Sequence, residues 1–161
     1  MKDPRAAELL AEIEEELSSL DKLVAGIAAV YGEMPKAANK MAVYNESLAL
    51  KLHNFYTGCE RIFARIAETL NGGAPVSGNW HKRLLKVMSL DVEGVRPRVI
   101  SRATFISLED FLAFRHLVRN IYGYELDSER LTALVERVEK VYAGFRKDVG
   151  GFNSFLKKMA G

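Results

Sequence analysis

Cysteine is nearly absent from this sequence: Cys59 is the only one, so the chain cannot form an intramolecular disulfide. Cys59 falls within a helical apolar pattern, where a buried and unreactive thiol is expected. No apolar run approaches the length of a membrane span. The N-terminus is acidic and lacks the continuous apolar segment of a signal peptide. We therefore expect a cytoplasmic protein with no membrane segment.

Histidines are few as well, and they are widely separated in the chain. His53, His81 and His116 include no pair at the His-x-x-x-His spacing that typifies a metal site on a helix, so no metal is expected. Strand signals are nearly absent, with residues 98–106 (RVISRATFI) as one short candidate. A glycine-rich phosphate loop needs a preceding strand, and none is found. The sequence predicts no cofactor.

Charge of one sign does not dominate, but the charges are unevenly placed. The net charge is +2 over 161 residues, a length that suits one domain with a hydrophobic core. Residues 1–34 contain eight acidic and three basic side chains, whereas residues 81–119 contain eight basic and four acidic ones. The basic segment could bind phosphates or an acidic partner. Two solvent-exposed helix faces of different charge would explain the pattern equally well.

Apolar periodicity is what the sequence has in abundance. Leucine, isoleucine and valine recur at three- and four-residue spacings from about residue 4 to 32, which predicts a helix that ends at the GEMP sequence. A second helix is predicted from about 36 to 70. The loop NGGAPVSGN (71–79) separates it from a short helix over about 79–89.

The remaining helices are predicted from capping signals. Pro97 interrupts a basic irregular stretch, and SLED (107–110) resembles a capping box that would begin the next helix at Ser107. Gly123 is expected to end or bend that helix. A last helix is predicted over about 128–158, with a kink expected at Gly150 and Gly151. The predicted fold is all-α, an antiparallel up-and-down bundle of four or five helices.

One stretch concentrates polar residues within a helical apolar pattern: FRHLVRNIYGYELD, residues 114–127. On a helix, Arg115 and Tyr122 would nearly superimpose with Arg119 close by, and His116 and Asn120 would form a neighbouring row. Such rows suit a half-buried surface where guanidinium groups bind phosphate or carboxylate oxygens. The alternative is an internal network that Arg115 and Tyr122 close with an acid of another helix, such as Glu60.

Three blocks of the sequence resemble, in their order, the HepT-like branch of the HEPN superfamily. They are LHNFYTGCERIFARIA (52–67), NWHKRLL (79–85) and FRHLVRNIYGYELDSERL (114–131). The resemblance covers most of the chain after about residue 42. It implies a single HepT-like helical domain over 1–161 that forms a homodimer. It also implies pairing, as toxin and antitoxin, with a nucleotidyltransferase-like protein.

Active members of that branch resemble metal-independent ribonucleases with a motif of Arg, four to six residues, His, and often Tyr two positions later. The resemblance implies that Arg115 holds the RNA phosphate and that Tyr122 is the tyrosine to which such antitoxins can attach a nucleotide. Asn120 stands where the histidine belongs, and asparagine cannot transfer a proton near neutral pH. A second register from Arg119 places Tyr124 at the histidine position.

The resemblance and the spacing together predict a set of site residues. The predicted catalytic residues are Arg115, Asn120, Tyr122 and His116; the predicted RNA- or nucleotide-binding residues are Arg119, Tyr124 and Arg115; Glu60 and Tyr56 are predicted to support them. Three functions remain open at this point. The chain is a toxin-type component with weak or degenerate ribonuclease activity, a non-catalytic nucleotide- or substrate-binding helper of a nucleotidyltransferase, or a structural dimer whose polar residues fix helix register.

Overall fold

A computed structural model of the chain describes residues 2–34, 38–120 and 127–161, except for the side chains of residues 38, 39 and 117–120. Within these residues the protein is all-helical, with helices α1 (Pro4–Gly32), α2 (Ala38–Leu70), α3 (Trp80–Met88), α4 (Arg102–Asn120) and α5 (Ser128–Ala160). The predicted all-α bundle is confirmed. Gly123 lies outside the described residues.

Local capping explains two of the helix starts. Pro4 occupies the first turn of α1, where its missing N–H is not needed, and the Asp3 carboxylate accepts a hydrogen bond from the Arg5 backbone. Asp127 caps α5 in the same way, accepting from the backbone N–H groups of Glu129 and Arg130. The α5 helix then continues through Gly150 and Gly151 as one element.

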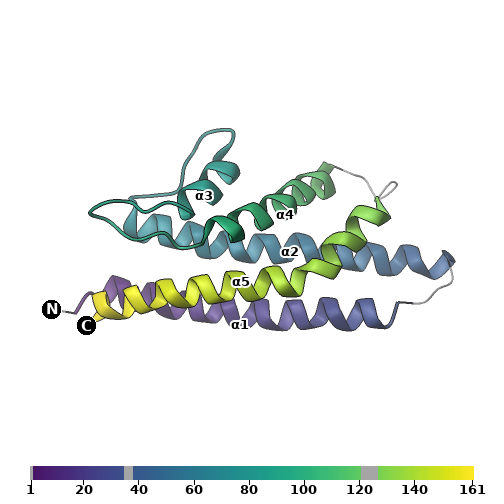
Figure 1. Cartoon of the computed structure of the whole chain (residues 1–161), viewed down its shortest axis with the longest axis horizontal. Coiled ribbons are helices and arrows are strands. Elements are labelled where there is room, and N and C mark those ends of the chain that lie inside the picture. The colour runs from purple at the N-terminus through teal and green to yellow at the C-terminus, as the bar shows by residue number, and fades with distance from the viewer. Residues whose placement is uncertain (1, 35–37, 121–126) are drawn as a thin grey trace.

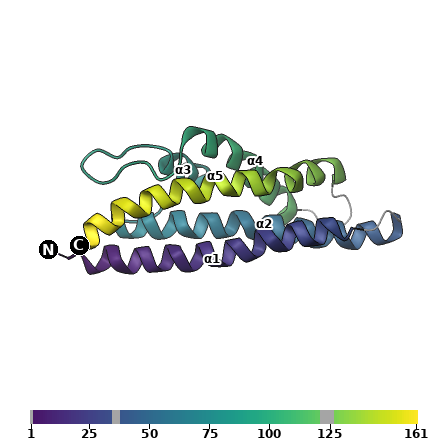
Figure 2. The same ribbon diagram turned by 60° about the horizontal axis from the view of Figure 1, so that its bottom comes forward.

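The long helices α1, α2 and α5 lie side by side, and α3 and α4 cover one side of α2 (Figures 1 and 2). The helix α3 contacts both α2 and α4. The two chain ends are close together, because the Asp3 N–H donates to the Met159 carbonyl across 3.3 Å. Glycine at position 58 permits the close approach of α1 to α2, since a Cβ there would lie 2.6 Å from Leu20 Cδ2.

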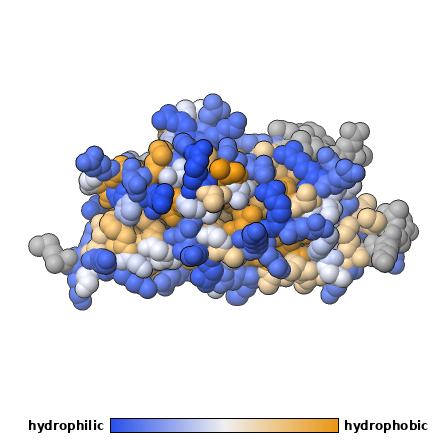
Figure 3. Space-filling view, in the orientation of Figure 1, coloured by the Kyte–Doolittle hydropathy of each residue, from blue (hydrophilic) through white to orange (hydrophobic). Residues whose placement is uncertain are grey.

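One hydrophobic cluster runs through all five helices. Its large side chains include Phe55 and Phe111, whose rings meet edge to face at 5.3 Å, and Phe63 and Phe145, which meet similarly at 5.8 Å. Cys59 is fully buried, as predicted, and burial raises the pKa of its thiol. Polar residues cover most of the face seen in Figure 3, and the apolar ones that show gather toward its middle.

The predicted start of the fourth helix is wrong. The helix α4 begins at Arg102, and Ser107 lies inside it with its hydroxyl donating to the Ala103 carbonyl. Ser101 caps the helix instead, because its hydroxyl oxygen accepts from the Thr104 N–H at 3.2 Å. The carboxylate of Asp148 on α5 accepts both the Ser101 N–H and the Thr104 hydroxyl, which anchors this helix start. Residues 98–106 accordingly form no strand.

The basic segment is not uniformly exposed. Arg96 is only 4% exposed, and its guanidinium donates to the side chain of Asn71 and to the carbonyls of Val87, Leu90 and Pro97. Burial lowers the pKa of Arg96. This arginine therefore ties the segment between α3 and α4 to the bundle. It is not available to bind phosphate. No helix of the described ranges is long and apolar enough to cross a membrane.

Candidate functional site

Arg115 and Glu60 form a buried ion pair between α4 and α2. Arg115 Nη1 donates to Glu60 Oε1 at 3.2 Å, and the two residues are 8% and 6% exposed. Charged side chains are rarely this buried unless they are paired, because desolvation costs several kcal/mol per ion. The pair therefore holds the Arg115 guanidinium in one place beneath the protein surface.

His81, the second residue of α3, completes the cluster. Its Nδ1 lies 2.7 Å from Glu60 Oε2 and 3.1 Å from Arg115 Nη1. An ionised carboxylate only accepts hydrogen bonds, so the proton is assigned to Nδ1, which donates a hydrogen bond to Glu60. With this tautomer the approach of Arg115 Nη1 to Nδ1 is a contact between two donors and not a hydrogen bond. The Glu60 carboxylate thus accepts from both His81 and Arg115, one oxygen to each. In the neutral ring this assignment leaves Nε2 as the nitrogen that can accept a proton.

Two aromatic rings fix the orientation of the His81 imidazole. The Trp80 ring lies against it in a tilted arrangement, with centroids 3.5 Å apart and planes inclined by 30°. The His116 ring of α4 meets it nearly edge-on, with centroids 5.4 Å apart and an angle of 79°. Trp80 also packs against the hydrophobic core. Three helices therefore supply the cluster: Glu60 from α2, Trp80 and His81 from α3, and Arg115 and His116 from α4.

Two buried polar atoms at this cluster, the Tyr56 hydroxyl and Arg115 Nε, have no hydrogen-bond partner among the described residues. Burial raises the pKa of Tyr56, and the nearby Glu60 carboxylate raises it further, so the phenol stays protonated. Buried polar atoms are normally hydrogen-bonded, and exceptions point to a water, ion or ligand that would satisfy them. Arg115 Nε belongs to the fork that guanidinium groups use to bind oxyanions.

The structure brings together only part of the predicted site. Arg115, His116, Glu60 and Tyr56 converge where α2 and α4 meet, and Glu60 lies against Arg115 as the sequence suggested. Arg119 and Asn120 are the last two residues of α4, and their side chains are not among those described. Tyr122 and Tyr124 lie outside the described residues, so the Arg115–Tyr122 row stays a prediction.

His81 is the residue that sequence reasoning missed. It is 34 positions from Arg115, and no helical spacing links residues so far apart. Its block, NWHKRLL, contributed to the family resemblance, and that was its only signal in the sequence. Among the described residues no group of three or more His, Cys, Asp or Glu side chains could hold a metal ion.

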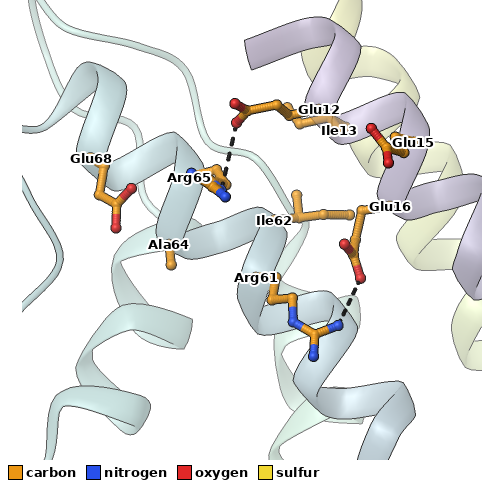
Figure 4. Close-up of a pocket in the computed structure, with 9 residues that line it drawn as sticks. All are labelled: Glu12, Ile13, Glu15, Glu16, Arg61, Ile62, Ala64, Arg65 and Glu68. Carbon is orange, nitrogen blue, oxygen red and sulfur yellow. Dashed lines mark hydrogen bonds and ion pairs between the residues drawn. The ribbon is translucent and has the colours of Figure 1, made fainter. Parts of the chain in front are cut away.

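A hollow of about 530 Å³ between α1 and α2 is a poor alternative site. Four glutamates and two arginines line it (Figure 4), and the arginines are paired across it: Arg61 with Glu16 at 3.3 Å and Arg65 with Glu12 at 3.6 Å. Both arginine side chains are more than half exposed, so the pairs are screened by water. The hollow is a solvated acidic groove with its cations already neutralised.

The fold and the cluster define a class: an all-helical bundle with a buried arginine–glutamate–histidine cluster where three helices meet. The family model described as HepT-like protein matches residues 47–156, which include Glu60, His81 and Arg115. The chain therefore belongs to the HepT-like family. Comparison with curated proteins and with solved structures gives no significant match.

Proposed function

We propose that this chain is the HepT-like component of a toxin–antitoxin-type pair, and that it cleaves RNA slowly and without a metal at the site around Arg115. Membership in the HepT-like family supports the pairing with a nucleotidyltransferase-like antitoxin. The observation that supports the site is the Arg115 guanidinium, which is buried, held in place by Glu60, and has an Nε without a partner among the described residues.

The arrangement around Arg115 suits a phosphate diester. A fixed guanidinium fork binds two oxygens of one phosphate and stabilises the additional negative charge that develops when the phosphorus is attacked. Glu60 holds the Arg115 guanidinium in place and His81 lies beside both, so the phosphate would meet the guanidinium in a fixed orientation. Asn120 replaces the motif histidine, and this substitution accounts for slow cleavage.

A cleavage assay with single-stranded RNA tests the proposed activity. The wild type should cleave slowly, Arg115→Ala should lose at least about 100-fold as a charge-stabilising group is removed, and Asn120→His should cleave faster than the wild type. Arg137→Ala serves as the matched control, because Arg137 pairs with Asp110 on the exposed surface. Equal cleavage by the wild type and Arg115→Ala would contradict the proposed site.

A non-catalytic helper function is distinguished in the same experiment. Binding of RNA or of a nucleotide without any cleavage, lost in Arg115→Ala and kept in Arg137→Ala, would assign the chain to substrate binding for a nucleotidyltransferase. The missing motif histidine favours this second function. Cleavage products that appear with the wild type and Arg137→Ala but not with Arg115→Ala would exclude it.

The partner and the oligomeric state need a separate test. Expression of the chain alone should slow cell growth, and co-expression of the nucleotidyltransferase-like protein from the adjacent gene should restore it. Light scattering of the purified chain should give the mass of a homodimer, twice 18.0 kDa. Growth inhibition that the adjacent protein does not relieve would contradict the pairing.

A further inference from the structure

We propose that His81 is the proton-transferring residue of the Arg115 site and that it takes over the task of the histidine that Asn120 replaces. The inference rests on the proposed ribonuclease function and names a residue on α3, outside the helix that carries the motif. Four observations support it: the hydrogen bond to Glu60, the contact with Arg115, the hollow that reaches His116, and the ring contact between His116 and His81.

The hydrogen bond to Glu60 prepares His81 to accept a proton. With Nδ1 donating to the carboxylate at 2.7 Å, the neutral ring has its free lone pair on Nε2. A carboxylate in this position holds the tautomer and stabilises the imidazolium that forms when Nε2 takes a proton. Glu60 is thus a positioning residue for His81 as well as for Arg115.

The contact with Arg115 places His81 next to the proposed phosphate. Arg115 Nη1 lies 3.1 Å from His81 Nδ1, so the two side chains are in contact. A phosphate bound by the remaining edge of the guanidinium would be within a few ångströms of the imidazole. The nucleophile of RNA cleavage, the 2′-hydroxyl, is attached to the ribose next to that phosphate. Proximity of this kind is what general base catalysis requires.

A hollow between α3 and α4 lies beside the cluster and reaches it through His116, while His81 and Arg115 themselves do not line it. Its volume is about 290 Å³, and its lining includes His116, whose ring contacts that of His81. Lys82 and Lys86 line the same hollow, and Lys86 Nζ lies 4.9 Å from the centre of the Phe105 ring. Exposed lysines beside an aromatic ring are the combination with which single-stranded RNA is bound, through phosphates and stacked bases. The His81 side chain is 12% exposed, which leaves part of it open to a ligand.

The chemical step balances with these groups. His81 Nε2 takes the proton of the 2′-hydroxyl as the 2′ oxygen forms a bond to phosphorus, and the bond from phosphorus to the 5′ oxygen breaks. The departing 5′ oxygen takes a proton from water, and the proton on His81 returns to solvent. The products are a 2′,3′-cyclic phosphate and a 5′-hydroxyl, with no oxidation or reduction.

The experiment compares histidine variants of the full chain on one single-stranded RNA. His81→Gln should lose about 10²–10⁴-fold in cleavage rate, the contribution of a general base, while it still binds the RNA. His53→Gln is the matched control, because His53 lies on α2 about two helical turns from Glu60, and it should cleave at the wild-type rate. The same RNA with a 2′-deoxy sugar at the cleaved position should resist the wild type.

Chemical rescue separates proton transfer from a structural role. Added imidazole should restore cleavage by His81→Gly, whereas Arg115→Ala should gain nothing, since imidazole supplies a base and no guanidinium. Circular dichroism and thermal melting establish that each variant is folded. Because rescue can occur only in a folded protein, it keeps the test decisive even if His81→Gly is less stable.

The outcomes distinguish this inference from the proposed function. Full cleavage by His81→Gln, with Arg115→Ala inactive, would overturn the role of His81 and leave the ribonuclease in place. Loss of cleavage in a folded His81→Gly that imidazole does not restore would also overturn it and make His81 structural. Absence of cleavage by the wild type would overturn the ribonuclease itself and the inference with it.

Discussion

Two acid–arginine clusters connect the helices of this bundle, and their surroundings differ. Between α1 and α5, Asp21 accepts two hydrogen bonds at 2.9 Å from Arg146 and one from the Tyr142 hydroxyl, with Asp21 and Arg146 side chains 42% and 49% exposed. Where α2, α3 and α4 meet, Glu60 pairs with Arg115 and His81, and all three side chains are at most 12% exposed. The Asp21 cluster is about half exposed to water, and the Glu60 cluster is largely shielded from it.

The difference shows which cluster is suited to bind a ligand. The Asp21 cluster is saturated: its arginine binds both carboxylate oxygens, and the buried Tyr142 hydroxyl also contacts the Leu17 carbonyl. It joins two helices at little cost of desolvation. The Glu60 cluster has paid a larger desolvation cost and still leaves Arg115 Nε without a partner among the described residues. A buried cation with an unpaired N–H is a feature that a ligand oxyanion would satisfy, whereas a saturated pair offers a ligand nothing.

The largest expected effect comes from breaking the buried cluster. Glu60→Ala should lower the free energy of unfolding by about 3–5 kcal/mol, because it leaves Arg115 buried without its anion. Urea unfolding followed by circular dichroism measures this loss. Glu12→Ala is the matched control: Glu12 is 47% exposed in its pair with Arg65, and a change within about 0.5 kcal/mol is expected. Equal losses in the two variants would contradict the comparison.

A double-mutant cycle tests whether Glu60 and Arg115 act as a pair. Glu60→Gln and Arg115→Met should each destabilise the protein, and the double variant should lose less than the sum by about 1–3 kcal/mol, since neither charge is then left alone. The two single variants should also impair the same RNA assays. Additive losses, or assays that respond to only one of the two residues, would show that Glu60 and Arg115 act independently.

Breaking the exposed Asp21 cluster should reduce the stability of the protein by less. Asp21→Asn should lower the free energy of unfolding by about 1 kcal/mol, because Tyr142 keeps the Leu17 carbonyl as a partner. Thermal unfolding should show a decrease in Tm of a few degrees. A loss as large as that of Glu60→Ala would mean that exposure does not distinguish the two clusters.

The same variant has a defined pH dependence. The hydrogen bond from Arg146 is the main cause that lowers the pKa of Asp21 below its ordinary value of 3.8. A lowered folded-state pKa gives stability that is present above 3.8 and is lost as the pH falls through the folded value. The stability difference between the wild type and Asp21→Asn should therefore be constant near neutral pH and shrink below about pH 4. A difference that grows on acidification would contradict the assignment.

The smallest effect is expected on the open surface. Arg137 and Asp110 pair at 3.2 Å between α5 and α4, with side chains about half exposed. Asp110→Asn should change the free energy of unfolding by no more than about 0.5 kcal/mol, and added salt should reduce even that. A loss above about 1 kcal/mol in low salt would show that this pair contributes more than its exposure allows.

The helices were largely predictable from the sequence. The misplaced start of α4 shows what local patterns could not supply. Ser101 is followed by Arg-Ala-Thr and Ser107 by Leu-Glu-Asp, and SLED is the better local match to a capping box. The choice depends on Asp148, which accepts hydrogen bonds from Ser101 and Thr104 across 47 and 44 residues of sequence. No local pattern contains that information.

The sequence by itself determined the helical segments, apart from the start of α4, and the family, because periodicity, breaker residues and motif blocks are local properties of the chain. It also marked Arg115 and Glu60 as a pair of interest. Only the tertiary structure decided that His81 joins them, since the packing of α3 against both α2 and α4 brings the imidazole to within 3.1 Å of Arg115. The tertiary structure also decided the burial of Glu60 and Arg115. Burial depends on which helices pack over a side chain, and the packed helices cover these two residues almost completely.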